Sequence, residues 1–499
     1  MQIDLINQEI SLVIRARYPI IYLITWEEMR ARRALVDIAR SLKKHIYFWS
    51  CSEAFEGKLG SAAASVSDPL GALSMVASSP ERAIFVFKDF HPYLDDFKII
   101  RRLRDIVYIL RKSYKTLILL SPVLKMPLEL EKEIVVYDFP LPDKEELENL
   151  LKKFLSEVST SPELKIESDD ELVERVINAS LGLTQSEAES VFAKVLVRDK
   201  KFTLDDLPLI IAEKKQIIRK SGFLEYFDLS ETIESVGGLG YLKNWLSKRA
   251  YAFSAKAREY GLPHPKGLLL LGVQGCGKSL TAKAIASLWK LPLLRLDVGS
   301  VFNPFIGASE ENMRRAIKIA ESLAPTVLWL DEVEKGFGAY FSSGERDGGT
   351  SSRVLATFLT WLQEKTKPVF VIATCNNIDD LPPEMLRKGR FDEIFFIDLP
   401  DYGERKEIFK IHFKKRKREP LKFDLDKLSQ MCGGFSGAEI EEIIISAMYN
   451  SFPENRDITT EDIINCIRET IPLSKIMSEK IESLRQWAKD RARPASPRT

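Results

Sequence analysis

Short apolar runs alternate with longer amphipathic stretches along both halves of this chain. The runs carry few charges, and the stretches between them place apolar residues at helical spacing. Apolar runs separated by helices predict a parallel sheet that is buried on both faces. The predicted strands are 18–25, 46–49, 83–87, 116–120 and 134–137 in the first half, and 268–271, 293–296, 327–330, 369–373 and 394–397 in the second.

The two halves repeat the same order of features. After its fifth strand, each half turns through a Leu-Pro-Asp corner, at 141–143 and at 399–401. A glycine turn before a helix follows in each, at 182–187 and at 434–439. We interpret this order as a duplicated unit in which a helical lid follows an α/β module. The expected boundaries are a first α/β module at 1–140, its lid at 141–212, a linker at 213–230, a second α/β domain at 231–398, its lid at 399–473 and a C-terminal tail at 474–499.

Composition and charge narrow the class of protein. With 499 residues, 45% hydrophobic content and a formal net charge of +1, the chain is typical of a globular protein of several domains. The near-neutral charge argues against a global nucleic-acid or polyanion-binding role and leaves open a local basic patch. The five cysteines and four histidines show no metal-binding spacing. No apolar run approaches the ~20 residues of a membrane helix, and the start lacks a secretory pattern, so we expect no membrane insertion and a cytoplasmic-type location.

A complete G-x-x-x-x-G-K-[ST] loop follows the first strand of the second half. Its glycines would let backbone N–H groups surround phosphate oxygens. Lys278 would place its charge on the β/γ-phosphates, and the Ser279 hydroxyl suits Mg²⁺. A chance match in a glycine-rich turn is the alternative, but the strand before the loop and the helix after it favour an ATP and Mg²⁺ site. The loop comprises Gly272, Val273, Gln274, Gly275, Cys276, Gly277, Lys278 and Ser279, and Leu280 follows it.

Two further strands of the second half end in polar groups that suit phosphoryl transfer. The apolar strand at 327–330 is followed by Asp331, which suits the Mg²⁺ shell, and by Glu332, which suits the attacking water. The strand at 369–373 leads to Asn376, which could contact the γ-phosphate or that water. A strand-terminating turn is the alternative role for this asparagine.

Two arginines lie on one glycine-containing loop near the end of the second half. Arg387 and Arg390 flank Gly389. Their guanidinium groups could neutralise charge that develops on a phosphate in the transition state. The alternative is a solvated basic surface.

Taken together, these residues resemble the AAA family of ATPases over about residues 230–473. The resemblance implies a P-loop NTPase fold, a doubly wound parallel sheet with a helical lid, preceded here by a degenerate AAA-like α/β module with its own lid. It also implies a homo-oligomeric ring, with a hexamer expected, in which Arg387 and Arg390 complete the neighbouring subunit's site. Val236 and Gly237 resemble the segment against adenine, and Ala438 lies in a stretch similar to the lid motif that contacts nucleotide.

The segment Phe305, Ile306 and Gly307 resembles the pore loop of members that thread polypeptides. The alternative is that Phe305 is a core aromatic residue. The surrounding glycines and Pro304 favour an exposed loop.

Three further stretches, at 358–365, 382–388 and 484–488, resemble cyanobacterial and plastid-encoded AAA proteins. For that group the resemblance implies the plastid stroma as a location, and it offers photosynthetic carbon use as a lead. Cys276 and Glu334 depart from the usual threonine and aspartate of the family. We expect neither change to abolish hydrolysis.

The first half lacks the chemistry of the second. Residues 26–30, Trp-Glu-Glu-Met-Arg, stand where a phosphate loop would follow the first strand, and Lys88-Asp89 replaces the acidic pair. We therefore expect a first module that does not hydrolyse nucleotide. ATP-driven remodelling of an unknown protein client is the predicted function. A nucleotide-dependent scaffold or switch, whose inert first module binds a partner, is the alternative, and nucleic-acid remodelling is the third possibility.

Overall fold

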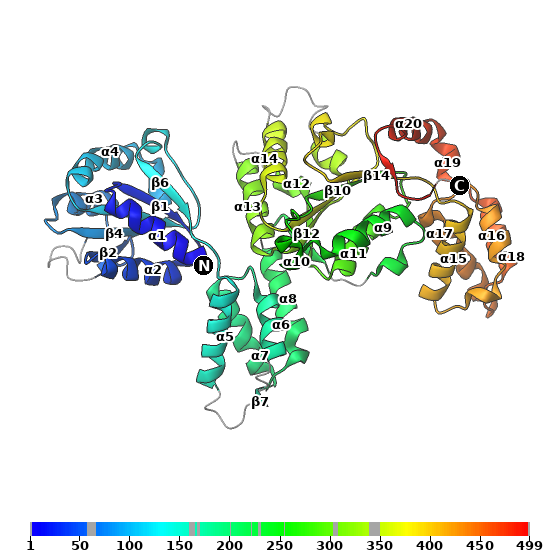
Figure 1. Cartoon of the computed structure of the whole chain (residues 1–499), viewed down its shortest axis with the longest axis horizontal. Helices are drawn as coiled ribbons and strands as arrows, with labels where there is room; N and C mark the ends of the chain where they lie inside the picture. The colour runs from blue at the N-terminus through cyan, green and yellow to red at the C-terminus, as the bar shows by residue number, and fades with distance from the viewer. Residues whose placement is uncertain are drawn as a thin grey trace. The chain divides into compact units, whose positions relative to one another are not determined.

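The computed structural model describes residues 2–56, 66–158, 165–166, 170–199, 201–220, 222–227, 231–253, 255–302, 308–338 and 350–497. The chain divides into two compact units, Met1–Lys214 and Lys215–Thr499. Each unit contains a sheet with helices on both of its faces and a separate group of lid helices (Figure 1).

The sheet of the first unit has six strands in the order β3-β2-β4-β5-β1-β6. All neighbours are parallel except β3, which is antiparallel to β2. The five strands predicted from the apolar runs are confirmed, and β3 is an addition. Their bounds are β1 Ile20–Ile24, β2 His45–Ser50, β3 Ala54–Glu56, β4 Ala83–Lys88, β5 Thr116–Ser121 and β6 Ile134–Asp138.

Helices cover both faces of this sheet because alternate strand side chains point to opposite sides. On β1, Ile20 and Tyr22 belong to the core beneath α3 and α4, whereas Ile21 and Leu23 belong to the core beneath α1 and α2. The bounds are α1 Gln2–Arg15, α2 Glu28–Ser41, α3 Pro69–Ser78 and α4 Phe97–Lys112.

A small helical lid completes the first unit. The rings of Phe154 and Phe192 lie 5.9 Å apart within its core. Two short strands, β7 and β8, pair in parallel beside these helices. The bounds are α5 Lys144–Val158, β7 Lys165–Ile166, α6 Asp170–Ser180, α7 Gln185–Asp199, β8 Lys201–Phe202 and α8 Leu207–Arg219, and α8 continues past the boundary at Lys214.

The second unit repeats the strand order of the first. Its sheet runs β15-β14-β10-β13-β12-β11-β9. When only the five predicted strands of each half are counted, the first strand lies between the fifth and the fourth in both units. The third strand and then the second follow beyond the fourth. An antiparallel strand, β3 or β9, is added beside the second. The bounds are β9 Leu224–Phe227, β10 Gly267–Gly272, β11 Leu293–Leu296, β12 Thr326–Leu330, β13 Val369–Cys375, β14 Glu393–Ile397 and β15 Arg493–Pro494.

Alternation again divides the second sheet between two cores. Leu268 and Leu270 pack under α9 and α11, and Leu269 and Leu271 pack under α13, α14 and α20. The bounds are α9 Gly240–Arg249, α10 Ala255–Glu259, α11 Lys278–Trp289, α12 Val298–Val301, α13 Ala308–Ser322, α14 Thr350–Glu364, α19 Leu473–Ile476 and α20 Ser478–Ala488.

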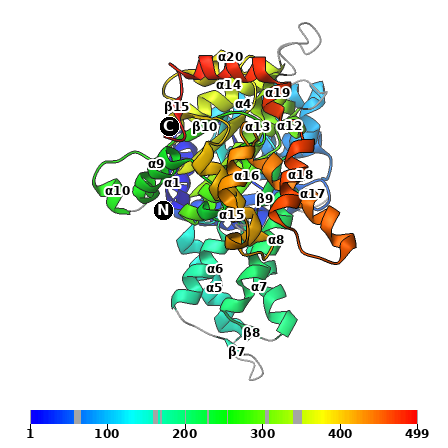
Figure 2. The same ribbon diagram turned by 90° about the vertical axis from the view of Figure 1, so that its right-hand side faces the viewer.

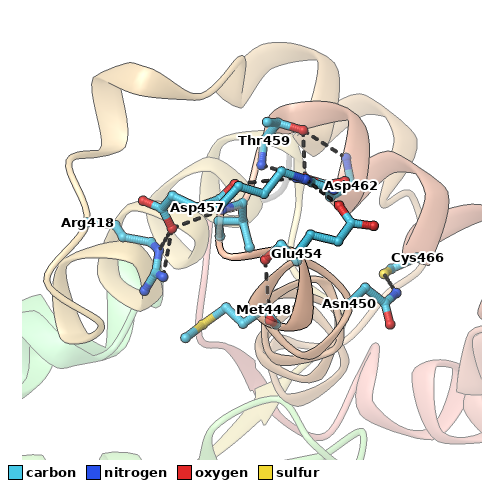
Figure 3. A network of polar contacts seen from close by, with 11 residues as sticks. Arg418, Met448, Asn450, Glu454, Asp457, Thr459, Asp462 and Cys466 are labelled. Atoms are coloured by element: carbon cyan, nitrogen blue, oxygen red, sulfur yellow. Dashed lines mark hydrogen bonds and ion pairs between the residues drawn. The ribbon is translucent and has the colours of Figure 1, made fainter.

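The second lid is a cluster of helices around its own apolar core (Figure 2). The start of α18 is fixed by a capping box between Thr459 and Asp462, and Arg418 pairs with Asp457 one turn earlier at 2.7 Å (Figure 3). These contacts join the loop after α15 to the end of the lid. The bounds are α15 Tyr402–Lys415, α16 Leu425–Met431, α17 Gly437–Ser451 and α18 Thr460–Glu469.

The segment 213–230, expected as a linker, contains more regular structure than that expectation allowed. Helix α8 continues to Arg219, and Leu224–Phe227 forms strand β9. Such short strands have too little apolar pattern of their own to be recognised, because they are stabilised by hydrogen bonds to the free edge of a neighbouring strand. The same reason explains why β3 and β15 were missed.

Candidate nucleotide site

The phosphate loop connects β10 to α11 at the carboxyl edge of the second sheet. Gly272 cannot be replaced here, because a Cβ atom would lie 2.0 Å from the carbonyl oxygen of Ile397. Gly277 has a φ of 85° directly before the helix. The loop lies where β10 separates β14 from β13, which is the switch point at which doubly wound sheets bind ligands.

Lys278 is buried at the first position of α11, with 6% of its surface exposed. Its Nζ donates to the carbonyl oxygens of Gly272 and Val273, at 2.9 and 2.8 Å. Burial lowers the pKa of this lysine. The ammonium is therefore held inside the loop, within reach of the space where β/γ-phosphates would lie.

Asp331 follows β12 and joins three elements of the site. Its Oδ1 accepts hydrogen bonds from Ser279 Oγ at 2.9 Å and from Thr374 Oγ1 at 2.7 Å. A hydroxyl and a carboxylate are the oxygen ligands that Mg²⁺ prefers. Ser279 and Asp331 therefore fit a Mg²⁺ ion, and Thr374 was missed because a threonine within an apolar strand is also typical of ordinary sheet residues.

Glu332 is held by a second set of contacts beside Asp331. Its φ of 48° is in the left-handed region, which a residue with a side chain adopts at a cost of about 1–2 kcal/mol. Its backbone N–H donates to Thr374 Oγ1 at 2.9 Å, and Lys335 pairs with its carboxylate at 2.6 Å. Asn376 Nδ2 donates to the same carboxylate at 2.9 Å. The strained turn thus places Glu332 and Asn376 together.

Glu334 stabilises the position of Asn376, the partner of Glu332. It is buried, and its Oε1 accepts the backbone N–H of Asn376 at 2.9 Å. The carboxylate therefore fixes the backbone at the end of β13. The departure from aspartate at this position gave only an indirect signal of such a role.

The segment that we expect to contact adenine packs against the lid helix α15. A Cβ atom at Gly237 would lie 2.7 Å from Ile408 Cγ1, so only glycine allows this approach. The backbone N–H groups of Gly238 and Leu239 donate to Glu407 and Glu404, at 2.8 and 3.1 Å. Val236, the residue before these, is buried.

The second lid also contacts the phosphate loop. The backbone N–H of Ala438, at the start of α17, donates to the carbonyl oxygen of Gly275 at 3.0 Å. Burial raises the pKa of the neighbouring Cys276 thiol to about 12, so it remains protonated. The structure therefore brings together Val236, Gly237, Gly275, Cys276 and Ala438 at the junction of body and lid.

The C-terminal tail braces the same junction, which sequence reasoning missed. The carbonyl oxygen of Ala495 accepts the N–H groups of Tyr241 and Leu242, at 2.9 and 3.0 Å. Arg485 on α20 binds Asp398 in a bidentate pair, with Nε to Oδ2 at 2.9 Å. Asp398 comes directly before the corner that leads into the lid. The resemblance of the 484–488 stretch to a family pattern was the available signal.

The two arginines lie on a loop at the amino ends of the strands of the second sheet, away from the carboxyl ends where the phosphate loop lies. Asp392 Oδ2 accepts the backbone N–H groups of Lys266 and Gly267, at 2.7 and 3.0 Å, and so ties this loop to the amino end of β10. The phosphate loop follows the carboxyl end of β10, roughly 17–20 Å away at the rise of a strand. Arg387 and Arg390 are therefore not brought to the phosphate loop of their own chain.

The expected pore loop, Phe305, Ile306 and Gly307, lies outside the described residues. The flanking structure is described on both sides. Asp297 caps α12 by accepting the N–H of Gly299 at 3.0 Å, and α13 starts at Ala308.

In the first unit, an ion network lies where the second unit has its phosphate loop. Arg30 is buried and pairs with Glu27 and Glu146, both at 2.6 Å. Glu27 also accepts the N–H of Gln185, at the start of lid helix α7, at 2.6 Å. Burial raises the pKa of Glu27, while the Arg30 charge opposes the rise. Charged side chains thus make the body-to-lid contact that Gly275 and Ala438 make in the second unit.

Comparisons with known proteins agree with this division. Residues 268–399 match the family described as ATPase family associated with various cellular activities (AAA). Residues 6–139 and 145–221 match the N-terminal and second domains of SpoVK-like AAA ATPases. Within the described residues, no helix has the length and apolar character needed to cross a membrane.

Several relatives extend over nearly the whole chain. The AAA domain-containing protein ycf46 of Trieres chinensis is 43% identical over 97% of this chain and 96% of its own length. The ycf46 protein of Pyropia yezoensis is 43% identical over 98% and 99%. A proteasome-activating nucleotidase of Saccharolobus solfataricus is 34% identical over 46% of this chain and 58% of its own.

A single nucleotide should bind each chain. Calorimetric titration with a non-hydrolysable ATP analogue and Mg²⁺ should give one site per chain, because the Arg30 network replaces the loop in the first unit. Lys278→Ala should abolish binding at that one site. The exposed Lys248→Ala is the matched control and should bind normally. A second site, or binding that survives in Lys278→Ala, would contradict this prediction.

Proposed function

The chain belongs to the AAA family of ATPases, to the group that contains the plastid-encoded ycf46 proteins, and we propose that it hydrolyses ATP to remodel a protein client or complex. The observation that supports hydrolysis most directly is the contact of Glu332 with Asn376 beside an Asp331 that is bonded to Ser279. These residues lie at the carboxyl ends of adjacent strands, where the phosphate loop also lies.

ATP would bind through the phosphate loop and the lid. Lys278 would exchange its two carbonyl acceptors for β/γ-phosphate oxygens, which gain more from a charged donor than carbonyl groups do. Mg²⁺ on Ser279 and Asp331 would neutralise charge on those oxygens. The adenine would lie near Val236 and Gly237.

Glu332 is the proposed base for the attacking water. Its carboxylate is oriented by Asn376 and Lys335, and it would accept a proton as the water attacks the γ-phosphorus. Asn376 would sense the γ-phosphate by moving between that group and Glu332. The left-handed turn at Glu332 supports this assignment, because strained backbone is often found at active sites.

A homo-oligomeric ring, with six subunits expected, would complete the site. Arg387 and Arg390 are tied to the edge of the sheet away from their own phosphate loop, so they could serve only a neighbour's nucleotide. Changes in the body-to-lid angle would then drive Phe305, Ile306 and Gly307 against a client. The plastid-encoded relatives support a location in the plastid stroma. A role in photosynthetic carbon use is part of the proposal.

A nucleotide-dependent switch is the second candidate. The Arg30 network favours it, because a first unit whose lid contact needs no nucleotide could hold a partner while hydrolysis in the second unit times assembly. Nucleic-acid remodelling has weaker support from a chain of formal net charge +1.

Replacement of the proposed base should separate binding from hydrolysis. Glu332→Gln should bind ATP with similar affinity but hydrolyse it at least about a hundredfold more slowly, since the amide cannot accept the proton. Steady-state phosphate release and nucleotide binding would be measured, with the exposed Glu311→Gln as the control. Full turnover in Glu332→Gln would overturn the assignment.

Mixed subunits should reveal the shared site. Arg390→Ala and Lys278→Ala proteins should each be inactive, but a mixture should regain activity at about a quarter of the interfaces after random assembly. ATPase activity would be measured after co-assembly is confirmed by mass. Absence of rescue in a confirmed mixed ring would rule out the action in trans.

The pore loop distinguishes remodelling from switching. Phe305→Ala should retain basal ATPase activity but lose any stimulation by an unfolded protein such as labelled casein, because the aromatic contact to the client is removed. Leu421→Ala, an exposed residue of the lid, is the control. Unchanged stimulation in Phe305→Ala would favour the switch.

A further inference from the structure

A row of cations lies along the amino edge of the first sheet. Strands β2, β4, β5 and β1 are neighbours in that order, and basic or aromatic residues precede each of them. This amino-edge cluster consists of Arg15, Arg17, Lys43, Lys44, Arg82, Lys112 and Tyr114.

Three members of the cluster converge on Tyr114, which precedes β5. The Arg17 and Arg82 guanidinium carbons lie 4.2 and 4.4 Å from the centre of its ring. Lys44 Nζ donates to the Tyr114 carbonyl oxygen at 2.8 Å. Cations from three different segments are therefore held around one aromatic residue that is itself 43% exposed.

No carboxylate neutralises Arg17, Lys44 or Arg82 within the described part of the chain. Two nearby acidic residues have other partners: Glu81, next to Arg82, accepts from the Tyr47 hydroxyl, and Asp37, the acidic residue nearest to Lys44 in sequence, pairs with Arg40. Burial, and then the charge of Arg17, lowers the pKa of Lys44. Among the residues that the structure describes, these like charges thus lie together without a paired carboxylate.

Backbone conformation adds a second, independent observation. Arg17 and Lys43 have φ values of 62° and 52°, in the left-handed region that glycine adopts without cost. Each lies two residues after the end of a helix, α1 or α2, and the N–H of the next residue, Tyr18 or Lys44, donates back to the last turn at 3.2 or 2.9 Å. Cations thus occupy two positions at which glycine would fold better.

The helix dipole explains only part of this pattern. Cations are favoured at helix C-termini, which accounts for Arg15 and Lys112 at the ends of α1 and α4. It does not account for Arg82, which directly precedes strand β4. Nor does it explain why Arg82 and Arg17 share the Tyr114 ring.

We propose that the amino-edge cluster is a docking surface for an acidic peptide segment of a partner protein. Guanidinium forks match planar carboxylates in a bidentate manner, and the stacked contacts with Tyr114 hold two of them ready. Four strand ends span roughly 15 Å, the length of about four or five extended residues. A nucleobase would have to displace a guanidinium group to stack on Tyr114, which favours a peptide over a single-stranded nucleic acid.

This surface is built without the nucleotide site, so its failure and that of the proposed ATPase function are distinguishable. Peptide binding should be the same in Lys278→Ala as in the natural chain. If Lys278→Ala lost as much peptide binding as the variants of the amino-edge cluster, the binding would belong to the nucleotide site and the proposal would be overturned.

The test uses the full chain and a dye-labelled oligoglutamate of about eight residues, measured by fluorescence anisotropy at low salt. Arg17→Gly combined with Arg82→Ala should weaken binding about tenfold or more. Lys43→Gly should weaken it severalfold while leaving the melting temperature unchanged or higher, since glycine relieves the left-handed strain. A merely structural role would lower the melting temperature instead.

Arg101→Ala is the matched control, because it removes one exposed cation from α4 outside the cluster. It should bind like the natural chain. The proposal fails if the peptide does not bind, if the cluster variants bind it as well as the control, or if an oligonucleotide of equal charge binds more tightly through the same residues. Arg82→Ala alone keeps the test decisive if the double variant does not fold.

Discussion

The nucleotide site depends on the hydrogen bonds that the carboxylate of Asp331 accepts. It receives the Ser279 hydroxyl from the helix after β10 and the Thr374 hydroxyl from β13, and it lies itself at the end of β12. One acceptor thus connects the phosphate loop to two neighbouring strands. Thr374 then accepts the Glu332 backbone N–H, so the geometry of the base follows from the same contact.

Two units with one strand order have reached different solutions at the same edge of the sheet. In the second, glycines leave room for phosphate, and a backbone hydrogen bond from Ala438 to Gly275 joins lid and loop. In the first, the buried Arg30 makes the corresponding contact through the buried Glu27 and the partly exposed Glu146. This contact is made by the chain's own charged groups and includes no nucleotide.

Much of the fold could be predicted because buried parallel strands are continuous apolar runs. All five predicted strands of each half are present, and the phosphate loop lies between β10 and α11 as its motif indicates. The short edge strands β3, β9 and β15 could not be predicted, since they depend on a partner strand rather than on their own pattern. Residues 213–230 were taken for a linker for that reason. The pairing of Arg485 with Asp398 also escaped prediction, because 87 residues separate the two partners.

The amino-acid sequence by itself determined which residues can bind phosphate and metal, because a glycine loop with lysine and serine needs only local backbone geometry. It also determined that the first half lacks such a loop. Only the tertiary structure decided which distant groups meet: Asn376 with Glu332, Glu404 and Glu407 with the backbone beside Gly237, and Arg17 with Arg82 around Tyr114. Such contacts depend on strand order and on register, and both follow from packing over the whole unit rather than from any local pattern.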